Sequence, residues 1–191
     1  MKLFASLLLS LGACATVFCQ TPTWQPDLTQ QQTYTPHRAS STDPTGANAD
    51  MRRVAPGETY TVLDVDGPGT IAHIWFTIAD GEPYHLKRIV LRMYWDGETN
   101  PSVETPIGDF FGLGLGEYHT WQSEMLSVGN DKSLNCFFPM PFAHHARITV
   151  TNEGKQTVNN LYWNIDYRHE SQALRVGTLY GELCSLARVS G

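Results

Sequence analysis

The strongest constraint on this chain is a set of segments in which apolar and polar residues alternate with a period of two. Such runs cover residues 60–65, 72–78, 89–95, 146–151 and 160–168. Successive side chains of a β-strand point to opposite faces of a sheet, so this period predicts strands with one buried face. No segment of ten or more residues carries the 3.6-residue apolar stripe of an amphipathic helix.

Turn-forming residues separate these runs. Gly67-Pro68-Gly69 follows the first run, residues 80–83 follow the second, and Asn152-Glu153-Gly154 follows the fourth. The 16 glycines and 11 prolines of the chain fit a fold with many turns. Five or more strands in one domain need a second sheet to cover their apolar face. The sequence therefore predicts an all-β fold of two packed antiparallel sheets, a β-sandwich or jelly roll.

The charge balance restricts the function. The chain has 19 acidic residues against 13 Lys and Arg, for a net charge of −6. Proteins that bind nucleic acid present a basic face, so we expect no nucleic-acid partner. Hydrophobic residues make up 41% of the chain, which is enough for a packed core and excludes general disorder.

The first 19 residues are typical of a secretory signal peptide. A basic start is followed by an apolar run over residues 3–13, which is too short to span a bilayer as a stable helix. Residues 11–14 fit a bacterial lipoprotein signal that would place a lipid anchor on Cys14, whereas residues 13–15 fit a soluble-export site and cleavage near Cys19 is a third alternative. The sequence predicts an exported protein: periplasmic, secreted or an outer-membrane lipoprotein.

Residues 20–39 are rich in Gln, Thr and Pro and are interpreted as a linker or an arm lying on the domain. Two cysteines lie beyond the leader, Cys136 and Cys184, and their spacing fits neither a zinc site nor a redox motif. A disulfide between them is compatible with export, but a buried free thiol at Cys136 is the favoured interpretation.

Acidic and aromatic side chains gather where the alternation fails, between Trp95 and Cys136. This segment holds four carboxylates beside three aromatic rings: Asp96, Glu98, Glu104 and Asp109 beside Trp95, Phe110 and Phe111. Carboxylates accept hydrogen bonds from sugar hydroxyls, and aromatic faces cover apolar C–H patches, so the mixture suits a carbohydrate site. From the residues alone, a turn at Asp96-Gly97 and ordinary solvated acids are the favoured alternative.

A second polar cluster covers residues 40–50. It contains Asp43, Asn48 and Asp50, but Thr45 and Ala47 occupy two positions that a calcium loop needs for ligands. Turn and capping roles are therefore favoured for the three polar residues. His144 and His145 are adjacent and would point to opposite faces of a strand, so no metal site is predicted. Without a nucleotide-binding glycine fingerprint, no cofactor is predicted either.

The ordered string Trp95-Asp96-Gly97-Glu98, Pro101-Ser102-Val103-Glu104 and Pro106-Ile107-Gly108-Asp109-Phe110-Phe111-Gly112 resembles the hallmark of glycoside hydrolase family 172. Residues 41–50, 67–75 and 135–142 also resemble blocks of that family, and the resemblance extends over residues 40–180.

The resemblance implies a function and an assembly. Family members hydrolyse furanosides, namely difructose dianhydride, α-D-fructofuranosides and D-arabinofuranosides, with retention of configuration and two glutamates. Each subunit is a double jelly roll, and subunits form trimers or higher oligomers with the active site near an interface. Ten positions carry over as substrate-binding or pocket-shaping residues: Asp43, Asn48, Asp50, Trp95, Asp96, Glu98, Glu104, Asp109, Phe110 and Phe111.

The chain also departs from the family. Residues 40–180 are similar to the first jelly roll only, and residues 181–191 lack the family pattern, which suggests a natural truncation or a frameshift. The catalytic glutamates are expected in the second half of family chains and do not map onto Glu98 or Glu104, so no catalytic residue is assigned. We therefore expect an inactive fragment of a hydrolase. The alternative is a carbohydrate-binding or assembly module without catalysis.

Overall fold

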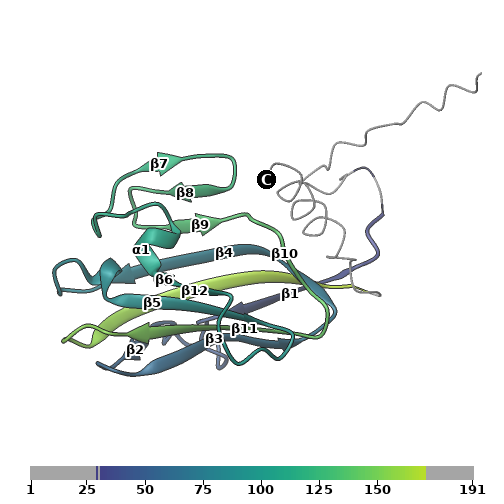
Figure 1. The fold of residues 1–191 in the computed structure, drawn as a ribbon, viewed down its shortest axis with the longest axis horizontal. Coiled ribbons are helices and arrows are strands. Elements are labelled where there is room, and N and C mark those ends of the chain that lie inside the picture. The colour runs from purple at the N-terminus through teal and green to yellow at the C-terminus, as the bar shows by residue number, and fades with distance from the viewer. Residues whose placement is uncertain (1–28, 30, 171–191) are drawn as a thin grey trace, which may run out of the picture. The chain divides into compact units, whose positions relative to one another are not determined.

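The computed structural model describes residues 29 and 31–170 of the protein and shows an almost entirely β structure (Figure 1). The chain divides into two units, residues 1–31 and 32–191, and all elements below belong to the second. The predicted signal peptide, Cys14, Cys184 and the tail at 181–191 lie outside the described residues. Part of the predicted arm at 20–39 is a strand, because Thr35–Ser40 pairs with the body of the domain.

The described chain forms twelve strands and two short helical turns in two antiparallel sheets. The larger sheet contains β1 (Thr35–Ser40), β2 (Arg52–Val54), β4 (Gly69–Ala79), β7 (Trp121–Gln122), β8 (Leu126–Val128), β9 (Leu134–Cys136), β10 (Met140–Phe142) and β12 (Val158–His169). The smaller sheet contains β3 (Thr59–Asp66), β5 (Ile89–Trp95), β6 (Val103–Pro106) and β11 (His145–Asn152). The helical turns are η1 (His85–Lys87) and α1 (Ile107–Phe110).

Two long strands form the centre of the larger sheet, which has the order β1-β12-β4-β9-β8-β7. Strand β12 pairs with β4 over nearly its whole length, and its other edge pairs with β1 and β2. The other edge of β4 pairs with β10 near the start of β4 and with β9 further along β4. The short strands β7 and β8 extend this side of the sheet beyond β9 (Figure 1).

The smaller sheet has the order β3-β11-β5-β6. The pairing of β3 with β11 shifts by one residue at Val62, because Leu63 pairs with Ile148 and Thr61 pairs with Thr149. This bulge leaves Val62 without a partner residue, and both Val62 and Leu63 are buried. The strict alternation that the sequence predicts for this strand is interrupted there.

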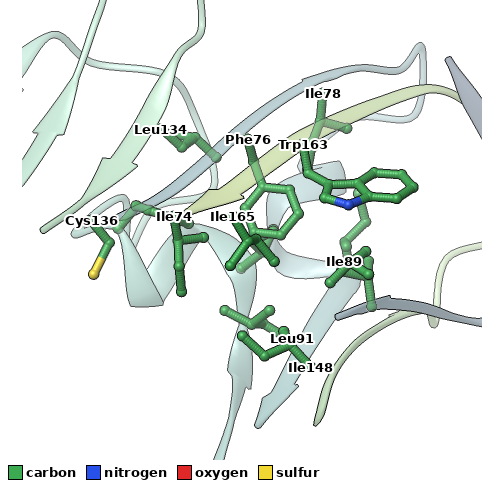
Figure 2. Close-up of a cluster of buried hydrophobic side chains, with 14 of the residues drawn as sticks. Ile74, Phe76, Ile78, Ile89, Leu91, Leu134, Cys136, Ile148, Trp163 and Ile165 are labelled. Atoms are coloured by element: carbon green, nitrogen blue, oxygen red, sulfur yellow. The ribbon is translucent and has the colours of Figure 1, made fainter. Parts of the chain in front are cut away.

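Apolar side chains from both sheets fill one core. Ile74, Phe76 and Ile165 of the larger sheet lie close to Leu91 and Ile148 of the smaller sheet in Figure 2. All five are fully buried, and the whole cluster draws on nearly every long strand. Two antiparallel sheets around one core confirm the predicted all-β sandwich. The jelly-roll connectivity and the place of this domain in a double jelly roll stay predictions.

The segment between Trp95 and Cys136 is not a plain loop. It contains β6, α1, β7, β8 and β9, each only two to four residues long. Elements this short show too few alternating positions to produce a period in the sequence.

Candidate functional site

Asp96 lies just after β5 and fastens the start of β11. Its Oδ1 atom accepts hydrogen bonds from the backbone N–H groups of Ala143, His144 and His145, at 3.0, 2.7 and 3.1 Å. Its φ is +53°, in the left-handed region that aspartate tolerates better than most residues. Burial raises the pKa of Asp96, but these backbone hydrogen bonds lower it by more, so the net shift is downward. The Asp96 carboxylate therefore links the turn after β5 to the start of β11.

The two glutamates of the family-like string differ in environment. Glu98 is exposed, and its carboxylate accepts a long hydrogen bond from the Ser102 hydroxyl, at 3.5 Å. Glu104, on β6, accepts a hydrogen bond from Arg92 on β5, with a shortest N–O distance of 2.8 Å. Arg92 also binds Glu153 at 2.9 Å. These contacts raise the pKa of Arg92, the hydrogen bond that Arg92 donates to Glu153 contributing most, so the guanidinium stays charged between two carboxylates.

The helical turn α1 carries the other end of the string. Lys87 of η1 donates to both carboxylate oxygens of Asp109, each at 2.6 Å. Phe111 is fully buried and makes edge-to-face contacts with Phe76 and Phe110, at centroid distances of 6.3 and 5.0 Å. Phe110 is half-buried at the margin of the core. Phe111, one of the three aromatic residues predicted at a sugar site, therefore faces the core.

The polar loop at 41–50 is closed by its own side chains. Asp43 Oδ1 accepts hydrogen bonds from the backbone N–H and the hydroxyl of Thr45, at 2.9 and 2.7 Å. Its own N–H donates to Asp50 Oδ1 at 2.8 Å. The Thr45 hydrogen bonds lower the pKa of Asp43. Asn48 is exposed. The turn and capping roles that the sequence favours for Asp43 and Asp50 match this geometry.

The ten predicted residues fall into separate places in the described domain. Strands β5 and β6 are antiparallel, with Val90 opposite Pro106 and Met93 opposite Val103. Trp95, Asp96 and Glu98 therefore lie at one end of this strand pair, and α1 begins at the other, about 17 Å away for a five-residue rise. The structure brings Trp95, Asp96 and Glu98 together, and likewise Asp109, Phe110 and Phe111, but not the two groups. Their role in substrate binding stays a prediction.

A pocket that the sequence does not reveal lies on β7, β8 and β9. Its volume is about 300 Å³, and its lining is Thr120, Trp121, Gln122, Ser127, Val128, Gly129, Ser133 and Asn135. Three hydroxyls and two side-chain amides are its polar side chains. The Trp121 side chain lies on the opposite, core-facing side of the strands, because Trp121 pairs with the buried Val128. No period is visible in the sequence here because each strand has only two or three residues. Gln122, Ser127 and Asn135 become neighbours on one face only once the three strands pair.

The remaining reactive side chains have structural partners. His145 Nε2 lies 2.7 Å from Asp64 Oδ1. Cys136 is a buried free thiol, and burial raises its pKa to about 11, so it is not a thiolate at neutral pH. Among residues 31–170, no three His, Cys, Asp or Glu side chains are grouped as metal ligands. Within the same residues, neither helical turn has the length or apolar character to cross a membrane.

Comparison with known proteins identifies the protein family. No curated protein matches the chain. A family model described as GH172 domain-like matches residues 45–165, which is more than half of the chain. The matched range includes nine of the ten predicted site residues and the pocket on β7–β9. This chain therefore belongs to the GH172 domain-like family of glycoside hydrolases.

Proposed function

We propose that this protein is an exported member of the family that binds fructofuranosides or D-arabinofuranosides, and that residues 31–170 do not catalyse hydrolysis by themselves. The family match over residues 45–165 is the observation that carries this proposal. The substrate class follows from the resemblance of residues 95–112 to the family string.

The contacts of the carboxylates support the proposal that residues 31–170 do not catalyse hydrolysis. A retaining glycosidase needs two carboxyl groups about 5–5.5 Å apart, and the one that acts as general acid needs a raised pKa. Glu104 is held by Arg92, and Asp109 is held by Lys87. Asp96 has a pKa that is lowered overall despite partial burial. A lowered pKa favours the ionised form, so Asp96 is a poor proton donor.

The activity prediction is tested directly. We expect the purified chain to release no 4-nitrophenol from 4-nitrophenyl α-D-fructofuranoside or from the D-arabinofuranosides above the rate without protein. An active family enzyme serves as the positive control, and a Glu98→Gln, Glu104→Gln double variant is assayed in parallel. Turnover by the parent that the double variant lacks would place the catalytic pair in this chain and contradict the proposal.

The second candidate function is a carbohydrate-binding or assembly module without catalysis. The contacts of Asp43, Asp96 and Asp109 favour it, because each of these carboxylates accepts hydrogen bonds from other groups of the same domain. Calorimetric titration with an intact furanoside tests the binding step: binding without turnover fits the first proposal and a carbohydrate-binding module, whereas absence of binding contradicts the first proposal and supports an assembly module. We also propose that the protein forms a trimer or higher oligomer, and light scattering measures this oligomeric state.

Export is proposed from residues 1–19, which lie outside the described residues. In a bacterial host, we expect the chain to reach the cell envelope with its leader removed. If Cys14 is the lipidation site, the protein incorporates a palmitate analogue and fractionates with membranes, and Cys14→Ser abolishes the label. A soluble, unlabelled periplasmic product would support the simple export signal. Retention in the cytoplasm with the leader intact would contradict export.

A further inference from the structure

We infer that His37 on β1 and His169 on β12 form a two-histidine binding site for a divalent transition-metal ion. The inference goes beyond the proposed function and does not depend on it, because it involves neither a furanoside nor any of the ten predicted site residues. The sequence predicts no metal site, since these two histidines are far apart in the chain and meet only when β1 pairs with β12 (Figure 1).

The strand register places both imidazoles on one face of the larger sheet. His37 lies opposite Tyr167 and Thr35 lies opposite His169, so the two histidines are diagonal neighbours in an antiparallel pair. Their face is the one that carries the fully buried Ile165, and Tyr167 packs against the margin of the core. Beyond Tyr167 this face leaves the core. His37 is exposed and His169 is half-buried, so an ion from solvent can reach both.

The separation of the two rings suits two ligands of one ion. The centroids of His37 and His169 are 4.8 Å apart, with an interplanar angle of 81°. A metal–nitrogen bond of about 2.0–2.1 Å places a ring centroid about 3.2 Å from the ion, so two adjacent ligands of a square-planar or tetrahedral ion have centroids about 4.5–5.2 Å apart. The observed separation lies in this range. Rotation about χ2, a torsion with broad preferences, turns one nitrogen of each ring toward the ion and leaves both centroids nearly in place.

The neighbouring strands and rings hold both ligands in position. The backbone of His169 pairs with Thr35 of β1 on one side and with Gly69 of β4 on the other. The His37 ring stacks on Tyr167, at a centroid distance of 5.3 Å and an interplanar angle of 18°. Ligands that are already ordered lose less conformational entropy when the ion binds.

The surroundings of the two imidazoles select the class of ion. Among residues 31–170, the ring contacts of His37 and His169 are with each other and with Tyr167. The adjacent Arg38 and Arg168 belong to the opposite face of their strands, because successive side chains alternate. Imidazole nitrogens suit Cu²⁺, Ni²⁺ and Zn²⁺, of which Cu²⁺ binds most tightly, whereas Mg²⁺ prefers oxygen ligands.

The test is a titration of the full chain, purified without a polyhistidine tag, with NiCl₂, ZnCl₂ and MgCl₂ by calorimetry and with CuCl₂ by electron paramagnetic resonance. We expect one site per chain for Ni²⁺ and Zn²⁺, no binding of Mg²⁺, and a Cu²⁺ spectrum split by imidazole nitrogens. Removing one of the two ligands, in His37→Ala or His169→Ala, should weaken Ni²⁺ binding at least about tenfold, because the chelate becomes a single contact.

Matched variants separate this site from scattered surface histidines. His119→Ala and His144→Ala each remove one exposed imidazole outside the strand pair and should leave the Ni²⁺ affinity unchanged. NiCl₂ should raise the unfolding temperature of the parent, since the ion binds only when β1 and β12 are paired, but not that of His37→Gln.

Three results would overturn the inference. They are a folded parent that binds neither Ni²⁺ nor Cu²⁺, a loss of Ni²⁺ affinity in His119→Ala or His144→Ala as large as in His37→Ala, and Mg²⁺ binding as tight as Ni²⁺ binding. Circular dichroism shows that each variant is folded before its affinity is compared. None of these results bears on the furanoside assays, which test other residues.

Discussion

Replacing Phe111 by alanine should lower the free energy of unfolding by about 3–5 kcal/mol. The ring is fully buried and packs edge-to-face on Phe76, so its removal takes away buried apolar surface and leaves a cavity. A loss of this size is a large fraction of the roughly 5–15 kcal/mol that stabilises an ordinary domain. Urea denaturation followed by tryptophan fluorescence measures the change.

Phe110→Ala is the matched control, because Phe110 is next in the chain and only half-buried. We expect Phe110→Ala to lower the free energy of unfolding by about 1–2 kcal/mol, because this half-buried ring buries less apolar area than Phe111 does. The sequence resemblance places both rings at a sugar site. A Phe111→Ala variant with the stability of the parent but without furanoside binding would contradict the core role and support that placement.

Asp96→Ala should destabilise the domain by about 1–3 kcal/mol at neutral pH. Three backbone N–H groups at the start of β11 lose their charged acceptor, and water replaces it only in part. Asp96→Asn keeps an acceptor oxygen without the charge, so its loss should be smaller. Equal stability of the alanine variant and the parent would contradict the fastening role of this residue.

The same residue gives the domain a pH dependence of known sign. The pKa of Asp96 is lower in the folded protein than its ordinary value near 4, so the folded state binds the proton less readily than the unfolded state. The stabilisation is therefore complete above about pH 4 and is lost as the pH falls through the lowered folded pKa. Denaturation at several pH values should show the parent and Asp96→Ala converging in acid. A difference that stays constant with pH would contradict this linkage.

The long strands were predictable because their physical cause is local. The five alternating runs correspond to β3, β4, β5, β11 and β12, with ends that differ by no more than three residues. In most of these strands one face is more deeply buried than the other, and this difference produces the period of two in the sequence. The bulge at Val62 and the strands of two to four residues depend on their neighbours in space, which a period cannot reveal.

The roles of the site residues were harder to predict because they depend on distant partners. The sequence shows a carboxylate beside aromatic residues at Asp96, but not that its acceptor oxygen meets the N–H groups of residues 143–145. It shows Phe110 and Phe111 as a pair, but not that only Phe111 turns into the core. The pocket on β7–β9 escaped prediction for the same reason, since its lining is assembled by strand pairing.

The central position of β12 has a consequence for when the domain can fold. β12 is the last described strand in the chain, yet it separates β1 from β4 in the larger sheet, and Thr35 pairs with His169. During synthesis, β1, β2 and β4 leave the ribosome long before their common partner. Contacts between such distant segments form slowly, because the entropy of closing the intervening loop is lost before the pairing is gained. The larger sheet of the nascent domain therefore stays incomplete until residues 158–169 have been made, so its edges remain unpaired for most of the time that synthesis takes.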